Sequence, residues 1–176
     1  ILSYGIGDKA QGLGLGIPYL AFLEIQLISI FMFIVGIPVS SMLSDRYGRK
    51  PVLIVTSVVM IAFGFSFPLF LGLDVADRNS VLCFLLVGMF CMGLIFGPMS
   101  AVLPELFPTN VRYTGSGIAY NVSSILGAAV APFIATWLVS TFNVNYVGYY
   151  LVAVCVVSLI AILVMKELKD QDLSEV

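Results

Sequence analysis

The sequence contains no histidine and few charged residues. Only 10% of its 176 residues are charged, whereas soluble domains carry about a quarter. Without histidine, the chain lacks the commonest zinc ligand and the side chain whose ordinary pKa lies nearest neutrality. No metal cluster and no nucleophile with a partner base is visible either. Any proton chemistry depends on carboxylates, and the sequence predicts neither an enzyme nor a metal site.

Net charge and cysteine content exclude two further classes. The net charge is −2, and the eight lysines and arginines occur singly or in one short cluster, so no nucleic-acid partner is expected. The three cysteines are odd in number and fall inside apolar runs. A disulfide framework is therefore not expected.

Long hydrophobic runs dominate what remains, because 60% of the residues are hydrophobic. A helix needs about 20 apolar residues to cross a bilayer, and helices satisfy their backbone groups without water. Such runs occupy residues 19–42, 51–71, 80–103, 115–140 and 149–165. The sequence thus predicts an all-α transmembrane helical bundle with about five spanning helices.

The positive charges orient this bundle. With five crossings, Arg46, Arg49, Lys50, Arg112 and the lysines of segment 166–176 lie on one side. The positive-inside rule makes that side cytoplasmic. Residues 1–18 then form an external segment, residues 166–176 form a cytoplasmic tail, and one helix of a larger unit is expected to precede the chain.

The tightest charged cluster lies between the first two spans and reads S-M-L-S-D-R-Y-G-R-K-P over residues 41–51. This cluster resembles the G-x-L-A-D-R-x-G-R-K signature of major facilitator superfamily transporters, with Ser41 in place of the first glycine. The resemblance implies one half of such a transporter, from the end of its seventh helix to its twelfth.

A second loop, P-E-L-F-P-T-N-V-R-Y-T-G over residues 104–115, is similar to the loop between the tenth and eleventh helices of metabolite:proton symporters and sugar porters. A structural salt bridge is one interpretation of its charges. The other is a cytoplasmic charge network that forms and breaks during transport. The members of this predicted network are Asp45, Arg46, Gly48, Arg49, Lys50, Glu105 and Arg112.

Residues 112–136 most resemble the metabolite:proton symporters, which move organic acids or zwitterions. A sugar porter is the alternative, but sugar porters usually carry P-E-T-K-G after the last helix, and residues 166–170 read K-E-L-K-D. The resemblance implies a multi-pass protein of the bacterial cytoplasmic membrane.

Polar side chains inside a spanning helix are costly and usually face a cavity or a partner. Tyr120, Asn121 and Ser124 share one face of the span 115–140 and are candidates for the substrate pathway. Small residues that follow them suggest a packing seam instead. Pro132 is expected to interrupt this helix.

Glu24 is the one ionisable residue well inside a predicted span. It lies about 9 Å from a helix start near Pro18, at 1.5 Å per residue. Glu24 either reaches the outer interface, favoured by the helix dipole, or forms a buried proton or substrate-charge site with a raised pKa. A second polar stripe lines the pathway or bonds to a neighbouring helix; it consists of Gln26, Ser29, Gly36 and Ser40.

These observations predict a secondary active transporter, proton-coupled and specific for a small organic acid or zwitterion. It would need the lipid bilayer, a proton gradient in place of a cofactor, and the N-terminal half of the same transporter. No nucleotide-binding motif is present. A non-transporting membrane anchor and a channel are the rival classes. An anchor gives no reason for the paired loop motifs, and a channel would favour a filter loop or a ring of like charges, neither of which is visible.

Overall fold

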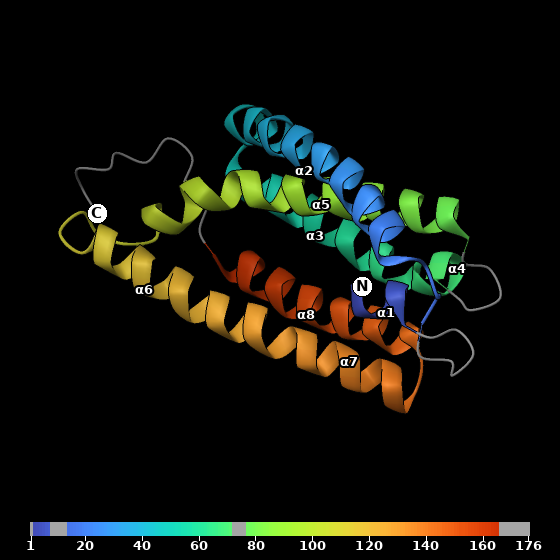
Figure 1. Cartoon of the computed structure of the whole chain (residues 1–176). Helices are drawn as coiled ribbons and strands as arrows, with labels where there is room; N and C mark the ends of the chain where they lie inside the picture. Colours follow the sequence, from blue (N-terminus) through green and yellow to red (C-terminus); the bar gives the residue numbers. More distant parts are fainter. Residues whose placement is uncertain (1, 8–13, 72–76, 166–176) are drawn as a thin grey trace.

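The computed structural model describes residues 2–7, 14–71 and 77–165, and these residues form helices without strands (Figure 1). Within these described ranges, four long helical stretches are apolar enough to cross a membrane: Tyr19–Tyr47, Arg78–Glu105, Arg112–Thr141 and Val144–Val164. The predicted all-α membrane bundle is confirmed. Cys83, Cys91 and Cys155 are free thiols.

The elements follow the chain in a simple order. A short helix α1 precedes the long α2 and its successors α3 to α5, and the last third of the chain forms α6, a π-helix η2, α7 and α8. Their bounds are α1 Leu2–Ile6, α2 Tyr19–Tyr47, α3 Arg49–Phe65, α4 Phe67–Leu71, α5 Arg78–Glu105, α6 Arg112–Ser124, η2 Ile125–Val130, α7 Ala131–Thr141 and α8 Val144–Val164.

The predicted span 51–71 consists of two helices, because the chain breaks between α3 and α4 at Ser66. The Ser66 hydroxyl donates to the Phe63 carbonyl at 2.7 Å, and Pro68 has no N–H with which to continue the α3 ladder. α3 alone is 17 residues long. Helix propensity in the apolar run could not reveal this break.

α2 and α5 make the most extensive helix contact in the described chain and lie side by side in Figure 1. Gly36 of α2 faces Gly93 of α5 so closely that a methyl group on Gly93 would lie 2.5 Å from the Phe33 carbonyl oxygen. Ser40 is fully buried at the same crossing, and its hydroxyl lies 3.1 Å from the Ile37 carbonyl oxygen of its own helix and 3.4 Å from the Gly93 carbonyl oxygen. Small residues let the two helix backbones approach each other closely, so that no gap remains between them.

The second polar stripe of α2 is largely buried. Ser29 is fully buried and donates to the Ile25 carbonyl at 2.8 Å, while Gly36 and Ser40 contact α5. These residues serve helix packing. Gln26, beside them, is half-buried.

The apolar core lies where α2 and α5 begin and α4 ends. Phe84 stacks on Phe63 with ring centroids 4.6 Å apart and meets the edge of Phe67 at 4.8 Å. Tyr4 of α1 donates to the Leu71 carbonyl at 2.9 Å, which ties α1 to this core. In contrast, no residue of α6, η2 or α7 is buried.

Candidate functional site

One end of the bundle gathers most of the described cations, and we call it the basic end. It comprises the end of α2, the start of α3, the end of α5, the start of α6 and the end of α8. The opposite end, called the far end, holds the starts of α2, α5 and α8. The turn at the basic end depends on Gly48, whose φ of 99° places it where side chains other than glycine are strained.

Arg49 and Glu105 form a salt bridge at the basic end. It joins the start of α3 to the end of α5. The two side chains are 22% and 16% exposed, so they are largely removed from solvent. Because loss of one partner leaves the other charge poorly solvated, this pair is more costly to break than a surface pair.

Lys50 ties α8 to the same loop. Its ammonium donates to the Leu163 carbonyl at 2.8 Å and to the Met165 carbonyl at 2.6 Å. The last carbonyls of a helix lack partners within the helix, and the helix dipole favours a cation there. The start of α3 thus connects to α5 through Arg49 and to α8 through Lys50.

The other members of the predicted charge network are placed differently. Arg112 donates to the Phe107 carbonyl at 3.3 Å and to the Thr109 hydroxyl at 3.4 Å, so it braces its own loop. The guanidinium carbon of Arg46 lies 5.5 Å from the centre of the Tyr47 ring. Asp45 is exposed and forms no salt bridge with another residue in the described ranges.

Glu24 lies at the far end and pairs with Arg78, at 2.9 Å, across α2 and α5. The side chains are 63% and 60% exposed. Of the two interpretations of Glu24, this position favours the interfacial one.

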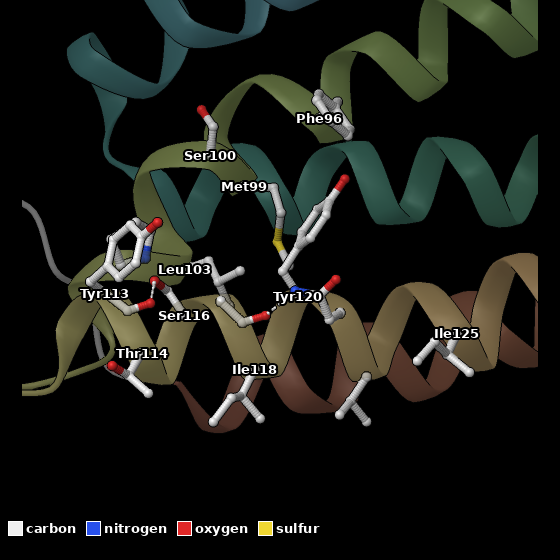
Figure 2. Close-up of a pocket in the computed structure, with 14 residues that line it drawn as sticks. Phe96, Met99, Ser100, Leu103, Tyr113, Thr114, Ser116, Ile118, Tyr120 and Ile125 are labelled. Carbon is white, nitrogen blue, oxygen red and sulfur yellow. Dashed lines mark hydrogen bonds between the residues drawn. The ribbon is translucent and has the colours of Figure 1, made fainter.

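A cavity of about 790 Å³ lies between the second half of α5 and α6 (Figure 2). Most of its lining is apolar, and none of the lining residues carries a charge. The lining residues are Phe96, Met99, Ser100, Leu103, Pro104, Tyr113, Thr114, Ser116, Gly117, Ile118, Tyr120, Asn121, Val122 and Ile125.

Two of the three candidate residues on this helix line the cavity. The Tyr120 ring extends from α6 toward α5, beside Met99 and below Phe96 (Figure 2). Asn121 also lines the cavity, whereas Ser124 lies outside it. Of the small residues after Ser124, Gly127 does not pack within the described chain, since a methyl group on it would meet nothing within 4 Å.

The α5 wall of the cavity was not predicted. Phe96, Met99 and Ser100 follow the i, i+3, i+4 spacing of a single helix face. Within an apolar span that spacing is equally typical of packing, so only the approach of α6 distinguishes the two roles.

The helix that forms the other wall changes its winding at the edge of the cavity. Residues Ile125–Val130 form a π-helix directly before Pro132, which cannot donate to the preceding turn. The predicted interruption at Pro132 is present. It separates α6, which lines the cavity, from α7, which packs against α8.

The helices and the cavity define a multi-pass membrane protein with a mostly apolar, uncharged recess between two spans. Residues 3–174 match the Major Facilitator Superfamily, and the chain belongs to this superfamily. This confirms the family predicted from the two loop motifs.

Named relatives agree with this assignment. The chain is 42% identical to the inner membrane metabolite transport protein YhjE of Escherichia coli K12, over 98% of this chain and 39% of that protein. It is 42% identical to a putative metabolite transport protein of Haemophilus influenzae, over 97% and 39%. It is 36% identical to the glycine betaine/proline/ectoine/pipecolic acid transporter OusA of Dickeya dadantii, over 77% and 27%. All three are named as transport proteins, which agrees with the prediction that this chain is not an enzyme.

The chain spans about two fifths of the length of the first two relatives. No solved structure matches it.

Proposed function

We propose that the full-length protein is a secondary active transporter of a small polar metabolite and that this chain forms one wall of its substrate pathway. The cavity between α5 and α6 is the observation that carries the proposal. It lies between two helices long enough to span a membrane and exposes Tyr120 and Asn121 to its interior. An anchor or assembly subunit has no use for such a recess.

The proposed arrangement places the basic end in the cytoplasm of a bacterial cell, beneath the inner membrane. Arg46, Arg49, Lys50 and Arg112 belong to this end, whereas Arg78 lies at the far end. The positive-inside rule supports this orientation. The remaining walls of the pathway would come from the N-terminal half of the transporter.

Uptake measurements test this proposal. Full-length protein in proteoliposomes is expected to accumulate a labelled metabolite saturably under an inward proton gradient. Collapse of the gradient with an ionophore is expected to leave equilibration without accumulation. Uptake equal to that of empty liposomes, over a panel of organic acids and zwitterions, would contradict transport. Accumulation that persists after collapse of the proton gradient would contradict proton coupling but not transport.

The position of Glu24 gives a prediction about the coupling site. Glu24→Gln removes an exposed pair with Arg78, and such pairs contribute about 0.2–1 kcal/mol. We therefore expect proton-driven accumulation to stay within about fivefold of wild type. Arg78→Gln is the matched control, because it removes the same pair and keeps the carboxylate.

Loss of accumulation in the Glu24 variant, with exchange across the membrane intact, would place the coupling proton on Glu24. The proposal then keeps its transport function, and the interfacial interpretation of Glu24 is wrong.

A further inference from the structure

Five aromatic rings form a continuous row at the far end of the bundle, where α7 and α3 end and α8 begins. These three helix ends lie at the same end of the molecule in Figure 1. Successive ring centroids are 5.8, 4.9, 5.9 and 6.3 Å apart, so the row runs unbroken from α7 through α8 to α3. We call it the aromatic row, and its members in order are Trp137, Phe142, Tyr146, Tyr149 and Phe65.

The aromatic row is not part of the apolar core. Each of its five side chains is between 45% and 58% exposed, whereas the core rings of Phe67 and Phe84 are buried. Within the described ranges, the indole N–H of Trp137 and the hydroxyls of Tyr146 and Tyr149 have no hydrogen-bond partner. Each of these three side chains therefore presents a large apolar ring together with a donor that still needs an acceptor.

No charged side chain marks this end of α7 and α8. The sequence contains no charged residue between Arg112 and Lys166, a stretch that includes both helices. Ionic groups of these helices therefore cannot hold the far end at the membrane surface. Tryptophan and tyrosine rings supply the same anchoring, because their apolar body favours the hydrocarbon and their polar tip favours the headgroup level.

The position of the row along α8 matches the thickness of a bilayer. Lys50 donates to the Leu163 and Met165 carbonyls and thus places an ammonium at the opposite end of this helix. From Tyr146 to Met165 the chain rises about 28 Å, at 1.5 Å per residue. The hydrocarbon core of a bilayer is about 30 Å thick. With the Lys50 ammonium at one face of the hydrocarbon, the aromatic row lies at the other.

We infer that the aromatic row is a lipid-binding surface at the membrane–water interface, and that its occupants are the glycerol-ester and phosphate groups of phospholipids. The rings lie against the upper parts of the acyl chains. The donors of Trp137, Tyr146 and Tyr149 bond to ester and phosphate oxygens, which only accept. The surface holds the far ends of α3, α7 and α8 at one depth. It requires the membrane-spanning fold and not the transport function, so its failure leaves the transport proposal standing.

Trp137 is the single tryptophan of this chain, and its fluorescence measures the depth of the row. Full-length protein is reconstituted in phosphatidylcholine vesicles whose acyl chains carry quenching bromine atoms either next to the headgroup or near the bilayer centre. The emission of Trp137 is the difference between wild type and Trp137→Phe, which cancels any tryptophan outside this chain. We expect the shallow bromines to quench this emission about twofold more than the deep ones.

Two further variants, both in the Trp137→Phe background, test the depth and the extent of the surface. Phe133 precedes Trp137 by one turn on the same face of α7 and is 78% exposed. Phe133→Trp is the matched control and lies about 6 Å nearer the bilayer centre, so its quenching is expected to shift toward the deep bromines. Tyr149→Trp places the probe on α8, where the shallow bromines are again expected to quench most.

Each other outcome overturns the inference. Strongest quenching of Trp137 by the deep bromines places the row inside the hydrocarbon. Quenching by iodide in the aqueous phase, and by neither lipid, places it in water. Quenching by none of the three shows that protein covers the row, either the N-terminal half or a second copy. Equal depth for Phe133→Trp and Trp137, or a Tyr149→Trp probe that no bromine reaches, contradicts a continuous interfacial surface.

Discussion

Gly93→Ala is expected to destabilise the protein strongly for a change of one methyl group. The added carbon would lie 2.5 Å from the Phe33 carbonyl oxygen and 3.1 Å from the Gly36 Cα. Both neighbours are backbone atoms, so no rotamer change relieves the clash, and α2 must move away from α5. Overpacking of this kind costs about 1–3 kcal/mol, and at Gly93 it acts on the most extensive helix contact of the described chain.

Thermal unfolding of the purified full-length protein in detergent measures this effect, together with the amount of protein in the membrane. Gly127→Ala is the matched control, because its methyl group meets nothing within 4 Å. We expect a lower midpoint and lower membrane level for Gly93→Ala only. Equal losses in both variants would show that the α2–α5 crossing is not the point of closest packing.

Reversal of one charge in the Arg49–Glu105 pair is expected to reduce transport at least tenfold. Arg49→Glu places two carboxylates together at a site where each side chain is less than a quarter exposed. Removing one partner of a buried pair typically costs about 3–5 kcal/mol, and partial exposure reduces this figure. Even about 1.4 kcal/mol shifts a balance between two conformations tenfold.

The exchanged pair Arg49→Glu with Glu105→Arg is expected to recover part of the transport rate, since the attraction returns with reversed polarity. Initial uptake rates, normalised to the amount of protein in the membrane, measure this recovery. Arg46→Glu makes the same charge change on an exposed side chain of the same loop. If Arg46→Glu lowers the rate as much as Arg49→Glu, or if the exchanged pair recovers nothing, the specific pair is not responsible. Normal transport in all variants would show that the Arg49–Glu105 pair contributes to folding and not to transport.

The sequence determined the class of this protein because membrane insertion is a local property of the chain. An apolar run must become a helix in lipid, whatever its neighbours are, since its backbone groups have no other partners. The helices Tyr19–Tyr47, Arg78–Glu105 and Val144–Val164 therefore enclose or closely match the predicted spans. Local chemistry also predicted the interruption of the helix at Pro132.

Only the tertiary structure decided which polar groups meet. The sequence allows Glu105 to pair with either Arg112 or Arg49, and helix packing selects Arg49. The sequence allows Glu24 to face either the interior or the interface, and the packing of α5 against α2 places Arg78 beside it. The stripe of Ser29, Gly36 and Ser40 and the pair Tyr120 and Asn121 look alike in sequence. Packing against α5 buries the stripe, whereas the pair lines an open cavity, because side-chain surroundings depend on how helices approach and not on spacing along one helix.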